Sequence, residues 1–313
     1  MSPPPWSRAT GLALAGALAG LAVTAHAPLT SAALLTDRAT VASSQVSTRT
    51  ACAAGPLYAA AVLAQTPSFY WRFAEVPPPA VTAVADSTSN AVGGTVMGGG
   101  LTVGAAPTGL ITCDDTGDVE GLGLLGSDGF VVAPTAVPNT DTFTVSAWVR
   151  MNSTRGGWVL GMASARWGTS SNRDRVLFVR DDGRPAFTVG QSPRVVVSGP
   201  TPVNDGLPHL LVATLGPAGM VLYVDGVAVA SDVTVTTGAT YTGNEPVDQP
   251  PPATAATPDG FGYWRVGYDE AGDLGPDAPS RNQLNGRIDE VAVWQTRALS
   301  ASAVAALYDQ NHW

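Results

Sequence analysis

Short segments in which hydrophobic and polar residues alternate recur along most of this chain. In residues 143–150 the alternation places every second residue on one face, as expected of a β-strand with one buried face. The residues on that face are Phe143, Val145, Ala147 and Val149. Further strands are predicted at residues 69–73, 158–162, 175–180, 185–189, 210–215, 220–224, 227–230, 263–267 and 288–294. Such regular spacing of short strands is typical of a β-sandwich and not of alternating strands and helices.

Turn-forming residues between these strands predict antiparallel hairpins. Asp225-Gly226 separates two apolar segments, and Asp-Gly is the strongest short-range hairpin signal. The segments DDGR at 181–184 and GPAG at 216–219 separate two further pairs of strands. The chain is therefore expected to fold into antiparallel sheets.

The C-terminal part combines a strand with a short helix. Residues 288–294 are rich in β-branched and aromatic residues, and Ser300 is expected to cap a helix over 301–308. Leu299 and Val304 are spaced as a hydrophobic staple across the start of that helix. The residues that form its apolar face are Val304, Leu307 and Tyr308. Because so short a helix is not stable alone in water, we expect this face to pack on the sheet.

Several of these segments carry recognisable motifs. The C-terminal strand has the motif IDEVAVW and the helix the motif LSxxxVAALY. Residues 58–75 (YAAAVLAQTPSFYWRFAE), 85–96 (ADSTSNAVGGTV) and 210–230 (LLVATLGPAGMVLYVDGVAVA) add an opening segment, a turn and central hairpins. Together they resemble the laminin G-like domains of the concanavalin A-like lectin and glucanase superfamily, of the secreted bacterial type.

The resemblance implies an all-β fold, a concanavalin A-like jelly-roll sandwich of two antiparallel sheets with a short C-terminal helix. It covers one domain at residues 57–310. The chain departs from the family pattern at Pro208, which lies in a segment where the family usually has a tryptophan. A second departure is a proline-rich insertion at residues 243–262, which we expect to form a surface loop.

The N-terminal residues have the pattern of an export signal. Arg8 precedes an apolar Leu/Ala/Gly-rich stretch that ends among small residues, which predicts a signal peptide over residues 1–33. The stretch is too short and glycine-rich to predict a stable membrane span after cleavage. Residues 34–56, rich in Ser, Thr and Ala, are expected to form an extended linker. The protein is thus predicted to be secreted, extracellular or associated with the cell surface.

Composition and charge narrow the class of partner. The chain is 45% hydrophobic and contains 35 Gly and 25 Pro, as suits a folded, turn-rich protein. Its net charge is −9, whereas nucleic-acid binding rests on clustered positive charge. Nucleic acid is therefore not expected as a partner.

Export also makes the two cysteines informative. In an extracytoplasmic protein an even number of cysteines is expected to oxidise, so Cys52 and Cys113 are predicted to form a disulfide. The loop it closes would contribute roughly 4 kcal/mol if the native geometry is unstrained. The alternative is two free thiols or a metal pair, although no CxxC accompanies them.

Signals for catalysis are sparse. Glucanases of the superfamily use a strand motif of three acids, but near Asp289-Glu290 no third acid completes it. The sequence also lacks a GxSxG elbow, an HExxH pair and a phosphate-binding glycine loop. His209 beside Pro208 is expected to be structural. We therefore do not expect an enzyme, and a glycan hydrolase or lyase is the alternative.

Calcium is the candidate inorganic ligand, because hard cations take carboxylate and carbonyl oxygens from loops and the resemblance implies such a site. The candidate ligands are Asp86 with Asn90, and Asp289, in segments that the family places near each other. The alternative is that Asp86 caps a turn while Asp289 pairs with an arginine. The sequence leaves both open.

Carbohydrate binding requires an exposed aromatic side chain flanked by polar groups. Trp167 is the best candidate, because it lies outside any alternating pattern among loop-forming residues. The predicted ligand-binding residues are Trp167, Asn172, Arg173, Tyr268 and Asp269. The alternative for Trp167 is a local packing role. Four other tryptophans lie inside strand patterns and are expected in the core: Trp71, Trp148, Trp264 and Trp294.

These observations predict a secreted, non-catalytic binding or adhesion module that recognises an extracellular glycan or a surface protein. The alternatives are the glycan hydrolase or lyase and a structural subunit of a surface or fibre. The sequence names neither the ligand nor the oligomeric state.

Overall fold

The computed structural model describes residues 56–75, 81–104, 121–190, 194–238 and 260–310. The predictions for the signal peptide, for Cys52 and Cys113, and for nearly all of the linker and the proline-rich insertion lie outside these residues. Two boundaries can be compared. The last residue of the predicted linker begins the helix α3 (Pro56–Ala64), and the last two residues of the predicted insertion belong to the strand β16 (Phe261–Val266).

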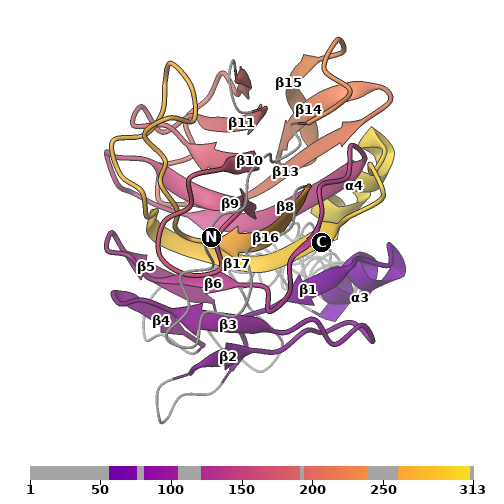
Figure 1. Ribbon diagram of the computed structural model, residues 1–313. Coiled ribbons are helices and arrows are strands. Elements are labelled where there is room, and N and C mark those ends of the chain that lie inside the picture. The colour runs from indigo at the N-terminus through magenta and orange to yellow at the C-terminus, as the bar shows by residue number, and fades with distance from the viewer. Residues whose placement is uncertain (1–55, 76–80, 105–120, 191–193, 239–259, 311–313) are drawn as a thin grey trace, which may run out of the picture. The chain divides into compact units, whose positions relative to one another are not determined.

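The described strands form two antiparallel sheets that face each other (Figure 1). The first, called the β8 sheet, has the order β15 (Val227–Asp232), β14 (Gly219–Val224), β13 (Pro208–Gly216), β8 (Phe143–Arg150), β17 (Asn285–Trp294), β5 (Leu122–Leu125) and β4 (Leu101–Val103), with β1 (Phe69–Trp71) paired to β17. The second, called the β9 sheet, has the order β12 (Val195–Ser198), β11 (Pro185–Val189), β10 (Arg173–Val179), β9 (Gly157–Ala163), β16, β6 (Phe130–Val132), β3 (Gly94–Met97) and β2 (Ala83–Val84), with β7 (Val137–Pro138) paired to β16. The predicted jelly-roll sandwich is confirmed.

The main core lies between the two sheets. Alternate residues of each strand enter it, as the period of two requires. On β8 these are the predicted Phe143, Val145, Ala147 and Val149, all fully buried. The four tryptophans expected in the core are also buried.

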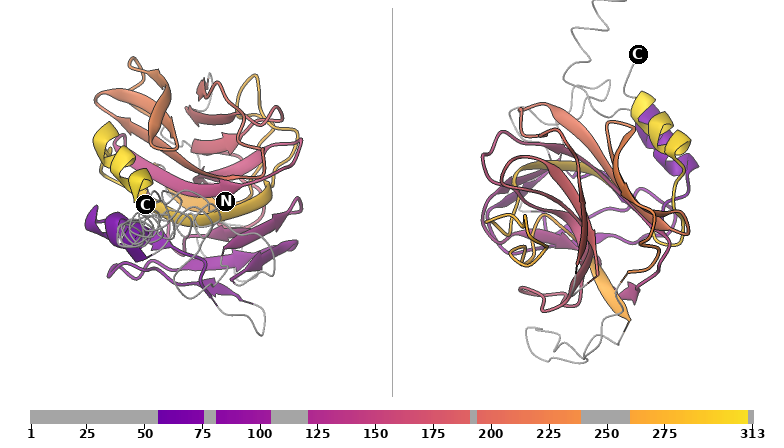
Figure 2. Two further views of the ribbon diagram at one scale, coloured as in Figure 1. Left: turned by 180° about the vertical axis from the view of Figure 1, so that it is seen from behind. Right: turned by 90° about the horizontal axis from the view of Figure 1, so that it is seen from above.

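A second core lies on the outer face of the β8 sheet. There α3 and α4 (Ala301–Asp309) lie side by side (Figure 2). Their buried residues form one cluster with Trp148 and Trp294. The Ser300 hydroxyl accepts a hydrogen bond from Ala303 N, so the predicted N-cap is confirmed. Leu299 and Val304 are both buried, as a staple requires. Neither described helix is both long and apolar enough to cross a membrane.

The backbone preferences of Asp225, Gly226 and Pro208 explain where two of the strands end or begin. Asp225 and Gly226 both have positive φ, 52° and 79°, which is the conformation that a two-residue type I′ hairpin turn requires. β13 begins at Pro208, two residues before the predicted start. Proline lacks a backbone donor but is tolerated as the first residue of a strand.

Candidate functional site

Trp167 and Tyr268, the two aromatic residues predicted to bind a ligand, line the same small pocket. We call it the aromatic pocket; its volume is about 200 Å³ and its other lining residues are Met97, Gly98, Asp128, Phe130 and Gly168. It lies on the outer face of the β9 sheet, beside β3 and β6. The sandwich thus brings together two residues from separate loops.

The wall of the aromatic pocket is a set of packed rings. The ring of Phe130 stacks on that of Tyr268 with centroids 6.0 Å apart and planes 19° from parallel. The Arg166 guanidinium lies 5.6 Å from the centroid of the Trp167 ring. Both Trp167 and Tyr268 remain partly exposed. Their faces are therefore held in place while part of each stays available to a ligand.

Asp128 supplies an exposed carboxylate at the rim of this pocket. Its Oδ1 accepts hydrogen bonds from Gly99 N at 3.0 Å and Ser127 Oγ at 3.2 Å. Within the described part of the chain its Oδ2 accepts none. The pocket therefore combines aromatic faces with a carboxylate oxygen free to accept a hydrogen bond.

A buried ion pair supports the pocket from beneath. Arg265 and Asp269 are both 0% exposed, and Arg265 Nη1 lies 2.8 Å from Asp269 Oδ2. Arg265 Nη2 donates to the carbonyl oxygen of Gly168 at 2.6 Å, next to Trp167. The same guanidinium lies 3.7 Å from the centroid of Phe130. One side chain thereby contacts the tryptophan loop and the ring that stacks on Tyr268.

Asp269 joins the same two loops from the other side. Its Oδ1 accepts hydrogen bonds from Ser170 N at 2.9 Å and Glu270 N at 2.7 Å, and its Oδ2 accepts one from Ser170 Oγ at 2.8 Å. Since this carboxylate is fully buried, it holds the pocket together and does not line it. The structure thus gives Asp269 a supporting position.

The other two predicted ligand-binding residues also lie away from the pocket lining. Arg173 is buried and its Nη2 lies 2.7 Å from Asp273 Oδ2. The backbone of Asn172 pairs with Ser164 through bonds of 2.9 and 3.2 Å. Both residues belong to the base of the tryptophan loop.

Asp128, Phe130 and Arg265 were not among the residues predicted from the sequence. Phe130 and Asp128 lie on or beside a three-residue strand, too short to show a pattern. Arg265 carried a usable signal, because the alternation of Tyr263, Arg265 and Gly267 places an arginine on the same face as Tyr263, with Asp269 four residues later.

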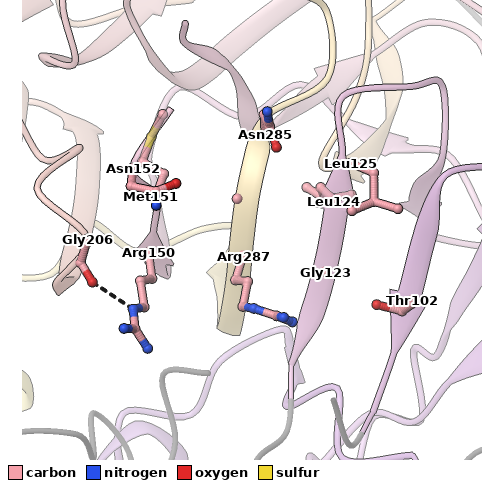
Figure 3. A pocket seen from close by; sticks show the side chains of 11 residues that line it. Thr102, Gly123, Leu124, Leu125, Arg150, Met151, Asn152, Gly206, Asn285 and Arg287 are labelled. Atoms are coloured by element: carbon pink, nitrogen blue, oxygen red, sulfur yellow. Dashed lines mark hydrogen bonds between the residues drawn. The ribbon is translucent and has the colours of Figure 1, made fainter. Parts of the chain in front are cut away.

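A second hollow, the arginine groove, lies on the outer face of the β8 sheet. Its volume is about 430 Å³, and it is lined by Thr102, Gly123, Leu124, Leu125, Arg150, Met151, Asn152, Gly206, Asn285, Gly286 and Arg287 (Figure 3). Nothing in the sequence singled it out, because its residues come from four strands and two loops.

The residues predicted to bind calcium have other contacts. Both oxygens of Asp86 accept two hydrogen bonds each, from the donors Tyr70 N, Thr88 N, Thr88 Oγ1 and Val92 N at 2.7–2.9 Å. Asn90 Nδ2 donates to the carbonyl oxygens of Pro67 and Ser68 at 3.2 and 3.0 Å. This is the turn-capping alternative, and donor hydrogens directed at Asp86 fit a cation poorly. Among the described residues no group of three or more His, Cys, Asp or Glu could hold a metal ion.

Asp289 and Glu290 are both 0% exposed on the outer side of the β8 sheet. Glu290 has a positive φ of 51° within a register shift of β17, and its Oε1 lies 3.1 Å from Arg72 Nε. Burial raises the pKa of Glu290 well above its usual value. An arginine thus pairs with Glu290, the neighbour of Asp289, and neither acid is accessible to a substrate.

Comparison with known proteins gives the family and the fold. A model of the family Laminin_G_3, described as concanavalin A-like lectin/glucanases superfamily, matches residues 125–305. No curated protein matches this chain.

Among solved structures, domain 4 of AbnA, a GH43 extracellular arabinanase from Geobacillus stearothermophilus, is 18% identical with a TM-score of 0.47, and the match covers 77% of this chain and 98% of that one. A heptameric SAP-like pentraxin from Limulus polyphemus is 16% identical with a TM-score of 0.39, over 57% of this chain and 75% of that one. The sialidase of Trypanosoma rangeli is 15% identical with a TM-score of 0.45, over 77% of this chain and 32% of that one. With its family match spanning more than half of its length, the chain belongs to the Laminin_G_3 family of the concanavalin A-like lectin/glucanases superfamily.

Proposed function

We propose that this protein is a secreted, non-catalytic module that binds an extracellular glycan through the aromatic pocket. The observation that carries the proposal is the meeting of Trp167 and Tyr268, from separate loops, around a hollow with a carboxylate at its rim. Sugars present apolar C–H faces that stack on aromatic rings and hydroxyl groups that donate hydrogen bonds.

The dimensions and polarity of the pocket support a small saccharide contact. At about 200 Å³ the pocket is smaller than the roughly 300–1,000 Å³ of sites that enclose a drug-sized ligand. A terminal sugar ring that lies against Trp167 suits this size. Asp128 Oδ2 is then the acceptor for a sugar hydroxyl, since its other oxygen already accepts two hydrogen bonds.

The buried pair Arg265–Asp269 supports the proposal energetically. A site whose aromatic side chains are already held in place loses less conformational entropy on binding. The guanidinium of Arg265 contacts Phe130 and Gly168 at once, so the positions of both aromatic walls depend on it. We infer that the pocket exists before the ligand arrives.

The signal pattern of residues 1–33 supports a position outside the cell, where the module would act in binding or adhesion. A surface protein is the second class of partner.

Calcium binding stays a prediction. The contacts of Asp86 and Asn90 favour the alternative, in which Asp86 caps a turn.

A glycan array probed with the secreted protein, once with calcium and once with chelator, tests the proposal. We expect saccharide-specific binding that Trp167→Ala abolishes and that Val227→Ala, a change at an exposed strand residue, leaves intact. Loss of signal in chelator alone would support calcium. Release of product from a bound glycan would favour the hydrolase or lyase, and self-association without any glycan signal would favour the structural subunit.

A further inference from the structure

Two arginines face the same groove from neighbouring strands. Arg150 on β8 and Arg287 on β17 are direct register partners in the antiparallel pair, so their side chains leave the same face of the sheet (Figure 3). Like charges placed directly opposite each other across two strands are destabilising. Burial, and then the charge of Arg150, lower the pKa of Arg287. An anion bound at Arg287 would offset the unfavourable effect on this guanidinium.

No described acidic side chain pairs with the Arg287 guanidinium at this position. Among the described residues that line the arginine groove there is no Asp or Glu. Within the described ranges the Arg287 guanidinium makes no hydrogen bond and no ion pair, and only the backbone of this residue is paired, in the ladder of β17. The Nε of Arg150 donates a hydrogen bond to the carbonyl oxygen of Gly206 at 2.7 Å. At least the Arg287 guanidinium is therefore available to a ligand.

Gly123 forms part of the floor of the groove, because glycine has no side chain to fill the space. A Cβ added to Gly123 would lie 2.5 Å from Thr102 Oγ1 and 3.1 Å from Arg287 Nη1. Glycine at this position thus leaves room for the Arg287 guanidinium, which in Figure 3 points from β17 towards Gly123 on β5. The result is a hollow of about 430 Å³, within the range of roughly 300–1,000 Å³ usual for ligand sites.

Neutral polar side chains surround the two arginines. Thr102, Asn152 and Asn285 line the groove, and all three are at least partly exposed. None of the three makes a side-chain hydrogen bond to another residue of the described part. Their hydroxyl and amide groups can both donate and accept, which is the chemistry that sugar hydroxyls require.

We propose that the arginine groove binds an acidic saccharide, with its carboxylate or sulfate group on Arg287 and its hydroxyl groups on Thr102, Asn152 and Asn285. The planar guanidinium forms paired hydrogen bonds with such oxyanions. This site lies on the opposite sheet from the aromatic pocket and does not depend on it. With a net charge of −9 the whole chain does not attract anions over long distances, so the affinity comes from these local contacts.

Isothermal titration calorimetry on the full secreted protein tests the groove. The ligands are hexagalacturonate, a heparin-derived hexasaccharide, the neutral cellohexaose and sodium sulfate. We expect one of the acidic hexasaccharides to bind, which distinguishes carboxylate from sulfate, and cellohexaose to bind at least about 10-fold more weakly. Sulfate alone that binds as tightly as the hexasaccharides would overturn the saccharide assignment.

Variants locate the binding. Arg287→Gln should weaken binding of the acidic hexasaccharide by about 10-fold or more. Arg287→Lys keeps the positive charge but loses the paired N–H donors of the guanidinium, so it should weaken this binding less. Arg184→Gln is the matched control, because Arg184 is an exposed arginine elsewhere on the protein. An unchanged thermal midpoint checks the folding of each variant.

The outcomes separate the two sites. The proposed site in the groove is supported if Arg287→Gln loses binding of the acidic hexasaccharide and Trp167→Ala keeps it. Equal affinity of Arg287→Gln and the unaltered protein, equal binding of cellohexaose, or no binding of either acidic hexasaccharide would overturn it. If Trp167→Ala alone abolishes the binding, the groove is refuted while the aromatic pocket stands.

Discussion

At the scale of single residues, the hydrogen-bonded histidine His209 links stability to pH. Its Nδ1 lies 2.7 Å from Asp225 Oδ2 and its Nε2 3.2 Å from Asp205 Oδ1. Burial by itself would lower the pKa of the imidazole, but hydrogen bonds and charges of the two carboxylates outweigh it and raise the pKa above 6.5. The structural role expected for His209 fits these contacts.

A histidine whose pKa is raised on folding stabilises the fold fully below its unfolded pKa, and this contribution is lost as the pH rises through the folded pKa. The free energy of unfolding of the unaltered protein should therefore exceed that of His209→Gln most at about pH 5.5, and the difference should shrink towards about pH 9. Urea denaturation across this range measures it. A difference that grows with pH would contradict the assignment.

The buried pair beneath the aromatic pocket gives a second residue-scale prediction. Asp269→Asn leaves the Arg265 charge buried without its counter-charge, so the variant should lose about 3–5 kcal/mol of unfolding free energy. Glycan affinity should fall with it, because the tryptophan loop loses its anchor. Asp182→Asn is the control, since it removes the ion pairs of an exposed carboxylate with Arg180 and Arg184, each worth about 0–1 kcal/mol. Chemical denaturation measures the unfolding free energy of both variants. Equal losses of this free energy would show that the buried pair Arg265–Asp269 stabilises the protein no more than an exposed pair does.

At the scale of elements, the C-terminal helix α4 depends on its docking. Leu307 is 1% exposed and packs with Trp148 and Trp294 on the outer face of the β8 sheet. Trp148 and Tyr308 also stack, with ring centroids 6.0 Å apart. The helix is thus held by tertiary contacts, as its short length requires.

Leu307→Ala should lower the free energy of unfolding by about 2–5 kcal/mol, as for other buried leucines cut to alanine. Gln310→Ala, at the C-cap, should be nearly neutral. Urea unfolding midpoints compare the two variants. Should Leu307→Ala unfold at the same midpoint as the unaltered protein, the helix would not be docked in solution.

At the scale of the whole molecule, the predicted disulfide Cys52–Cys113 would close a loop of about 60 residues and add roughly 4 kcal/mol. Both cysteines lie outside the described residues. Peptide mapping of the secreted protein without reductant should yield one linked peptide that separates on reduction. Two thiols open to alkylation before reduction would show the prediction to be wrong.

Local periodicity determined the architecture of this protein. The alternation in residues 143–150, the Asp225-Gly226 turn and the capped helix after Ser300 each depend on neighbours within a few residues. A period of two places Val145 and Ala147 in the core in any antiparallel sandwich, so their burial followed from the sequence. The family motifs carried the same information.

The candidate sites depend on which distant segments meet, and only the tertiary structure decided that. Of five predicted ligand-binding residues, Trp167 and Tyr268 reach the aromatic pocket, while Asp269 is drawn beneath it by Arg265. The pairing of Arg150 with Arg287 requires the register between β8 and β17. A one-residue slip in that register would move either arginine off its partner, and no local pattern in the sequence records such a register.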